Sequence, residues 1–367
     1  MIEGAKTLDE QQNSISEFTV QFFADSVSVD GMVLPLGQIS TDVLNVGGDV
    51  LVALREKNLE LFTVLERELF NLNTKKDAAL ADALQHRLNG VLDIVYELPL
   101  YRNLRIDREF GRKLFLHTFQ NEPEVFMRLA YPQSMENAAL AGLVGSLLAV
   151  YDESVSFCTY ISILLDFYYE KLKRRNCEHY AVGLYDFFTN IPMQQKIAKS
   201  LPPSPGFQFR QSWKAHIEYT TMPNPANEKE YIIAERMAFE SIGAFLHVDF
   251  FRGLIKGNAP RRCHNCGRYF LLTDGYDTRY CNNIAPSETE RTCRKVGAHR
   301  KEAQKAGSSL IHAEYRKVYS RLKTRKRRGN ISVDEWNRQV ALAQDYKEQA
   351  EKGQISELEL KRLYEKI

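Results

Sequence analysis

The 367-residue sequence lacks an apolar run long enough to cross a membrane. Its longest such run, residues 138–150, falls short of the ~20 residues that a membrane-spanning helix needs. The first seven residues contain no apolar stretch of the kind found in a secretory signal peptide. Because the chain is long and has no such signal, we do not expect a disulfide framework. We therefore predict a cytoplasmic protein that has reduced thiols and does not associate with membranes.

The sequence also lacks the short motifs of the common enzyme classes. It has no P-loop and no G-x-G-x-x-G, H-E-x-x-H or G-x-S-x-G motif. Its eight histidines are scattered, and His264 is badly placed to activate water in a nuclease. Asp249 and Asp274 are isolated carboxylates, which we interpret as a helix-surface residue and a turn residue. We predict that the protein is not an enzyme.

Four of the six cysteines lie in one short segment and are Cys263, Cys266, Cys281 and Cys293. The first two have C-x2-C spacing, in which two thiolates bind one metal from a tight turn, and the later two complete a tetrahedral set. We predict that these four residues bind one structural zinc ion. Because zinc also accepts imidazole, His264, His299 and His312 remain alternatives to Cys293 as the fourth ligand.

The residues between the cysteines predict a small folded unit around the metal. Residues 268–272 and 278–280 flank a turn signal, which predicts a hairpin between the second and third ligands. Ser287 and Glu290 have the spacing of a capping box, which predicts a helix that begins before Cys293. A C-x2-C turn, a hairpin and a ligand-bearing helix together predict a treble-clef-like zinc finger.

Two segments of this finger resemble the bacterial CGNR-type zinc finger, and they are Arg279-Tyr280-Cys281 and Cys293-Arg294-Lys295-Val296-Gly297-Ala298-His299-Arg300-Lys301. The chain lacks Gly-Asn-Arg after the last cysteine and has a longer gap between its third and fourth cysteines. The finger and the Trp336 segment are more similar to an uncharacterised bacterial family with a domain of unknown function, over about residues 235–345. The resemblance implies zinc-dependent nucleic-acid binding and no known reaction.

The charge of the chain is unevenly distributed, although the net charge is only +2. From Arg291 to Arg328 there are fourteen lysine or arginine residues and two acids, a local charge of +12, so the rest of the chain carries −10. A basic segment on an acidic body is typical of a nucleic-acid-binding appendage. We predict nucleic-acid binding, to DNA in preference to RNA, through Arg291, Arg294, Lys295, Arg300, Lys301, Arg325, Lys326, Arg327 and Arg328.

The alternative is a protein-interaction module with a purely structural zinc site. In that case the basic helices are only solvated surfaces, and a protein partner or self-association is expected.

Hydrophobic periodicity predicts a mainly α fold with a small β element. Asp30-Gly31 between alternating apolar residues predicts an N-terminal hairpin, and residues 207–219 read as a strand that pairs with it. Capping boxes at Ser332 and Ser356 predict the starts of the last two helices. Helical spacing of apolar residues predicts helices over about 49–70, 78–98, 134–150, 153–173, 228–255 and 308–328.

These elements divide the sequence into consecutive parts. The predicted parts are a mobile tail (1–15), a mainly helical body (16–225), a connector helix (226–262), a zinc finger (263–305), and basic and C-terminal helices (306–367).

Overall fold

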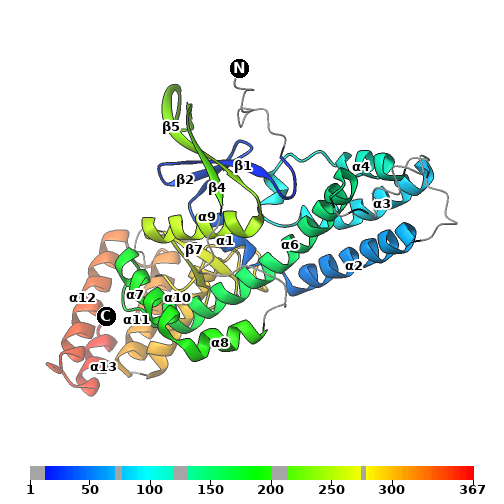
Figure 1. The fold of residues 1–367 in the computed structure, drawn as a ribbon. Helices are drawn as coiled ribbons and strands as arrows, with labels where there is room; N and C mark the ends of the chain where they lie inside the picture. Colours follow the sequence, from blue (N-terminus) through cyan, green and yellow to red (C-terminus); the bar gives the residue numbers. More distant parts are fainter. Residues whose placement is uncertain are drawn as a thin grey trace. The chain divides into compact units, whose positions relative to one another are not determined.

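The structure is a computed structural model that describes residues 13–70, 77–119, 131, 133–200, 214–273, 278–308 and 310–367. The chain divides into two compact units. The N-terminal unit extends to Arg262 and includes Arg268–Thr278, and the C-terminal unit comprises Cys263–Gly267 and Arg279–Ile367. Helices dominate the described residues and the sheets are small and antiparallel, so the prediction of a mainly α fold is confirmed (Figure 1). The predicted mobile tail lies almost entirely outside the described residues.

The N-terminal unit contains a five-stranded antiparallel sheet with the strand order β3-β2-β1-β5-β4. Its strands are β1 (Phe18–Phe23), β2 (Ser26–Val29), β3 (Met32–Pro35), β4 (Ala215–Asn224) and β5 (Asn227–Phe239). Asp30 and Gly31, between β2 and β3, have φ of 45° and 90°, as a two-residue hairpin turn with two left-handed residues requires. The predicted N-terminal hairpin is confirmed.

The predictions for residues 207–262 are confirmed only in part. The predicted strand is confirmed over residues 215–219, which lie in β4, and residues 207–213 lie outside the described part. The predicted helix over 228–255 is the strand β5 followed by α9 (Ile242–Lys256), which starts at the N-cap Ser241. In the structure, therefore, residues 226–262 do not form the single connector helix that was predicted.

The cause of this difference is non-local pairing. Met237 and Ala238 fit a helical apolar stripe, but in the fold they pair with Val20 and Thr19 of β1. The β-branched Ile232 and Ile233 favour a strand. It is β5, and not the predicted strand, that joins the N-terminal hairpin.

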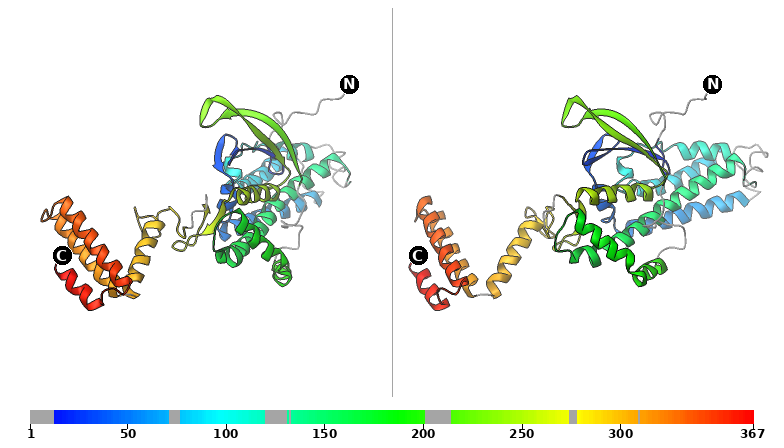
Figure 2. Two further views of the ribbon diagram at one scale, coloured as in Figure 1. Left: turned by 90° about the vertical axis from the view of Figure 1, so that its left-hand side faces the viewer. Right: turned by 60° about the vertical axis from the view of Figure 1, so that its left-hand side comes forward.

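Long helices of the N-terminal unit lie side by side (Figures 1 and 2). Among the described residues, the α-helices of this unit before β4 are α1 (Gln38–Val43), α2 (Gly48–Phe70), α3 (Ala78–Val95), α4 (Phe110–Phe119), α6 (Met135–Ile163), α7 (Cys177–Thr189) and α8 (Ile191–Ser200). Leu54 and Leu61 of α2 and Leu84 and Leu88 of α3 are fully buried, as their spacing predicts. The predicted helices over 134–150 and 153–173 are one helix, because no glycine or proline separates them.

The helix α6 continues into the π-helical turn η3 (Leu164–Tyr168) and the short η4 (Tyr169–Lys171). Among the described residues, this one helical stretch is long and apolar enough to cross a membrane by length and composition alone. Such a single helix is weak evidence, because core helices of soluble proteins pass the same test. Leu147, Phe157 and Ile161 are fully buried within the protein core.

Asp249 of α9 is buried, so its interpretation as a helix-surface residue is wrong. Its carboxylate accepts hydrogen bonds from the backbone N–H groups of Gly37 and Ser40, both at 2.9 Å. These groups lie at the start of α1, where helical N–H groups have no intrahelical partner. Burial raises the pKa of Asp249 above its usual range, although the two backbone hydrogen bonds oppose the shift. A distant side chain therefore caps α1. Asp274, interpreted as a turn residue, lies outside the described residues.

The C-terminal unit is largely helical, with α10 (Cys293–Ser308), α11 (Leu310–Arg327), α12 (Val333–Glu351) and α13 (Glu357–Glu365). Its own small core consists of Val318, Leu322, Ala343, Ala350, Leu360 and Tyr364. Ser332 accepts a hydrogen bond from the Glu335 N–H, and Ser356 accepts one from the Glu359 N–H. Both predicted helix starts are confirmed.

Candidate metal centre

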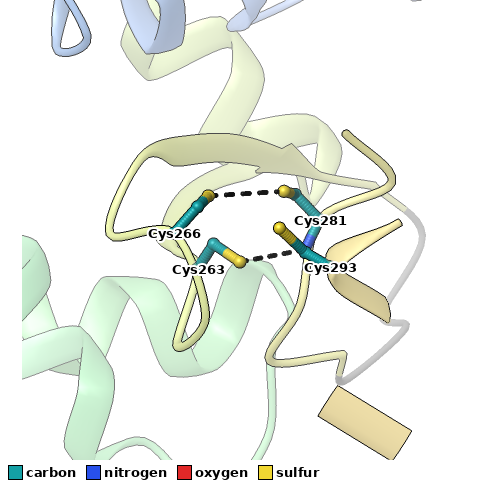
Figure 3. A group of neighbouring side chains, drawn as sticks. All are labelled: Cys263, Cys266, Cys281 and Cys293. Carbon is teal, nitrogen blue, oxygen red and sulfur yellow. Dashed lines mark hydrogen bonds between the residues drawn. The ribbon is translucent and has the colours of Figure 1, made fainter. Parts of the chain in front are cut away.

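Four sulfur atoms of the C-terminal unit lie close together (Figure 3). The Sγ atoms of Cys263, Cys266, Cys281 and Cys293 are all within 4.8 Å of one another. A tetrahedral ion bonded at ~2.3 Å to four thiolates places the sulfurs about 3.8 Å apart. The Sγ atoms of Cys266 and Cys281 are 3.7 Å apart, which fits this spacing. The cluster could therefore hold one metal ion.

The first two cysteines lie in the turn of a hairpin formed by β6 (Ala259–Arg262) and β7 (Tyr269–Leu272). The Gly267 N–H donates to the Cys263 carbonyl at 2.9 Å, and Gly267 has a φ of 76°. Glycine reaches this left-handed conformation without strain, which lets the chain turn back after Cys266.

The prediction of a hairpin between the second and third ligands is wrong, because β7 pairs with the strand before the first ligand. The other edge of β7 is occupied at Tyr269. The Asn45 side chain accepts from the Tyr269 N–H at 2.7 Å and donates to the Tyr269 carbonyl at 2.8 Å. A returning strand cannot use these backbone groups.

Backbone hydrogen bonds position the third and fourth cysteines. The Cys281 N–H donates to Cys263 Sγ at 3.4 Å, and the Cys281 carbonyl accepts from the Arg294 N–H at 3.0 Å. The Cys293 N–H donates to the Asn283 carbonyl at 2.8 Å. The ligand loop is thus tied to the first residues of α10.

The helix α10 begins at Cys293, and the Thr292 hydroxyl accepts from the Lys295 N–H at 3.3 Å as its N-cap. The predicted capping box at Ser287 is wrong. Ser287 lies outside the helix with a φ of 66°, and the nearby Glu288 pairs with Arg291 instead. The local S-x-x-E pattern was therefore insufficient, because Ser287 adopts a left-handed conformation and Thr292 caps the helix instead.

Three further residues, Asn265, Tyr280 and Gly297, support the site and were not among the predicted site residues. The Asn265 side chain donates to Cys293 Sγ at 3.3 Å, a contact that orients this sulfur from a residue outside the ligand set. The ring of Tyr280 packs so closely on Gly297 of α10 that an added Cβ would lie 2.5 Å from it. Only the position of Asn265 within the C-x2-C turn signalled such a role.

The electrostatics of the cluster suit a cation. Burial disfavours the Cys263 thiolate and acts to raise its pKa. Hydrogen bonds from the backbone N–H groups of Cys266, Cys281 and Asn265 have a larger combined effect and lower the pKa of Cys263 to about 7. Burial raises the pKa of Cys281 above its usual range. Cys263, Cys281 and Cys293 are at most 3% exposed. Buried thiolates this close repel one another strongly unless a cation lies between them.

The group of converging ligand atoms consists of sulfur only. His312, one of the alternatives to Cys293, pairs through Nε2 with Glu351 at 3.0 Å. His264 and His299 are exposed and do not join the group.

The predicted nucleic-acid-binding residues form two groups, one at α10 and one at the end of α11. Arg294, Lys295 and Arg300 are exposed on α10, and the side chain of Lys301 lies outside the described part. Arg291 precedes α10 and forms a two-pronged ion pair with Glu288.

The other group is the basic end of α11, where the four predicted residues differ in environment. Arg325 donates to the Ile367 carbonyl at 2.9 Å, and the Lys326 ammonium lies 4.0 Å from the centre of the Trp336 ring. These two residues hold the C-terminal helices together. Arg327 and Arg328 are exposed and have no ion pair among the described residues.

The exposed surface of α11 also carries Arg316 and Lys323, which were not among the predicted site residues. They lie eleven and four positions before Arg327, so the three share one helical face. The spacing of these three residues in the sequence could therefore have predicted a cationic helix face.

The fold and the cysteine cluster define a mainly α protein with a candidate four-thiolate metal centre. Residues 210–367, which include β4, β5, α9, the cysteine cluster and the C-terminal helices, match a family described as "Family of unknown function (DUF6076)". No curated protein and no solved structure matches the chain.

Proposed function

We propose that the chain binds one structural zinc ion and that its C-terminal unit binds nucleic acid, DNA in preference to RNA. The main support for nucleic-acid binding is a row of exposed cations along α11. The resemblance of residues 279–281 and 293–301 to the CGNR-type finger supports the same role. The proposal includes no catalytic step.

Zinc is supported by the donor set and by its spacing. Four cysteines that begin with a C-x2-C turn are a common structural zinc set, and the sulfur spacing matches one tetrahedral ion. A zinc ion with four protein ligands has no open position for water or substrate, so its role is to stabilise the fold. The Asn265 amide would fix the Cys293 thiolate from outside the first coordination shell.

The cationic row on α11 fits a ladder of phosphates. Arg316, Lys323 and Arg327 are exposed on one face and span about 16 Å along the helix axis, at ~1.5 Å per residue. Ser320 and Thr324 lie between them, and no acid occurs on this face. None of the three cations has an ion pair among the described residues. Cations held on a rigid surface bind phosphates and release counterions.

The helix α10 would provide a second contact. Because α10 begins at a metal ligand, the metal would fix its starting direction. Arg294 and Lys295 lie in its first turn and are exposed, and Arg300 follows two turns later. A rigid basic helix is an element that a groove of duplex DNA can accept.

One set of contacts favours the alternative, a protein-interaction module with a purely structural zinc site. Arg291, Arg325 and Lys326 are engaged within the chain, by Glu288, Ile367 and Trp336. Part of the basic segment therefore stabilises the C-terminal unit itself.

Fluorescence anisotropy of the full-length zinc-loaded protein separates the two functions. The probes are duplex DNA, duplex RNA and single-stranded DNA of one sequence, each titrated at several salt concentrations. We expect salt-dependent binding, and the triple variant Arg316→Glu, Lys323→Glu and Arg327→Glu to lower the salt slope by about 2.7, at ~0.9 per lost phosphate contact.

A matched triple variant reverses three exposed cations of the N-terminal unit, Arg55→Glu, Arg87→Glu and Lys196→Glu. It changes the net charge equally and is expected to leave the slope almost unchanged. Absence of salt-sensitive binding by the wild-type protein to every probe would reject the proposal in favour of the interaction module. Tighter binding to RNA than to DNA would reject the preference for DNA.

A further inference from the structure

The hairpin of β4 and β5 extends beyond the rest of its sheet (Figures 1 and 2). The neighbouring strand β1 pairs with β5 only at Glu235–Phe239, and the remainder of β5 pairs with β4 alone. The other side of β4 has no pairing strand among the described residues. The hairpin is therefore a two-stranded arm with an open edge.

One face of this arm is apolar and exposed. Ile217 and Tyr219 of β4 and Tyr231 and Ile233 of β5 lie on the same face, since each strand alternates and the register pairs Thr221 with Ile233. Their exposed fractions are 55%, 71%, 73% and 73%. We call these four side chains the arm face.

The arm face continues the core side of the sheet. Ile217 pairs with Met237, which is only 3% exposed and contacts Arg252 of α9. Near Met237 the sheet is covered by α9, and farther along the arm the same side is exposed. The apolar side chains of the arm thus resemble those that α9 buries near Met237, but they are exposed to solvent.

The size of the arm face is that of an interaction surface. A buried tyrosine contributes about 150–250 Å², so the four side chains expose on the order of 500 Å². Two such faces in contact bury on the order of 1,000 Å², which is the lower limit for a specific interface. The largest apolar patch on a typical monomer is about 300–600 Å² and is often functional, so the arm face is large enough to be a contact site.

Charge argues against nucleic acid as the occupant of this face. Residues 214–240 contain five acids and three lysine or arginine residues. Glu235 is the charged residue that the register places on the same side, and Arg252 already neutralises it. An apolar surface without an unpaired charge fits another apolar surface, and a second copy of the chain always supplies an identical one.

We propose that the arm faces of two copies of this chain pack against each other in a two-fold symmetric dimer. This inference is independent of the proposed nucleic-acid binding. In this proposal the β4–β5 arm mediates self-association, whereas the C-terminal unit binds nucleic acid.

Sedimentation equilibrium of the full-length protein over about 1–100 μM tests the proposal, because interfaces of this size associate weakly. We expect a monomer–dimer equilibrium. The double variant Tyr219→Lys and Ile233→Lys should raise the dimer dissociation constant at least about thirtyfold, as the loss of a central apolar contact does. Ala226→Lys, in the exposed turn of the same arm, adds a positive charge away from the face and should have little effect.

Circular dichroism of each variant checks that the fold is retained, and Tyr231→Ser provides a milder second change. A wild-type protein that remains monomeric throughout this range would overturn the proposal. A dimer that the double variant and Tyr231→Ser leave intact would also overturn it, because association would then use another surface.

Discussion

Substitution of Gly297 by alanine should destabilise the C-terminal unit, although the same change normally strengthens a helix. In the middle of a helix, alanine is favoured over glycine by about 1 kcal/mol. At Gly297, however, the new Cβ would lie 2.5–2.6 Å from three atoms of the Tyr280 ring. The ring is rigid and is attached next to the ligand Cys281, so α10 or the ligand loop must shift.

Overpacking costs about 1–3 kcal/mol, and three contacts below 3.0 Å with a rigid ring place Gly297→Ala in the upper half of that range, above the gain in helix propensity of about 1 kcal/mol. We expect a net loss of about 1–2 kcal/mol in the unfolding free energy of the C-terminal unit. Since metal binding and folding are coupled, zinc affinity should fall by about five- to thirtyfold. Thermal unfolding of the zinc-loaded protein and competition with a chromophoric chelator measure the two effects.

The matched control is Gly145→Ala in α6, where an added Cβ meets no atom within 4 Å. This variant should gain stability by up to about 1 kcal/mol. The variant Gly297→Ala combined with Tyr280→Ala should recover part of the loss caused by Gly297→Ala. If Gly297→Ala stabilises the protein as Gly145→Ala does, Tyr280 does not fix the position of α10 and our reasoning is wrong.

Three other predictions address the metal and the core. Cys263→Ser should abolish zinc binding and unfold the ligand loop, since such sites contribute on the order of 10–16 kcal/mol; metal analysis should find zinc retained in the control Cys158→Ser. Chelation should remove the structure of the metal centre but leave most helical circular dichroism, because α1–α9 have their own core, and complete loss of signal would contradict this. Asp249→Asn should cost about 1–3 kcal/mol, because Gly37 and Ser40 donate to different carboxylate oxygens and asparagine replaces one of these with an NH2 donor. Since the folded-state pKa of Asp249 is raised, the stability of wild type relative to Asp249→Asn should fall as pH rises from about 3.8 through that pKa. Parallel pH profiles of the unfolding free energy for wild type and variant would contradict this.

Sequence patterns whose cause is local predicted the structure well, except for the capping box at Ser287. The C-x2-C turn brings its two sulfurs together over four residues, and the Asp30-Gly31 turn and the caps Ser332 and Ser356 depend on adjacent backbone groups. The cysteine cluster could be recognised from the sequence because few types of side chain bind a soft metal ion. The candidate ligands were therefore limited to a few residues.

The tertiary structure decided which strands pair and which charges are available. β5 was mistaken for a helix because Met237 and Ala238 are buried by β1, more than two hundred positions earlier in the chain. Asp249 looked isolated, but its partners lie at Gly37 and Ser40. Contacts between residues so far apart in the sequence cannot be predicted from the helical periodicity of a segment or from its charge.

The same distinction applies to the candidate sites. The sequence alone determined four thiols, a basic segment and a mainly helical chain. Only the fold separated the engaged Arg325 and Lys326 from the exposed Arg316, Lys323 and Arg327, and only strand register placed Tyr219 and Ile233 on one face. The physical reason is that exposure depends on what packs against a side chain, and packing partners come from remote parts of the sequence.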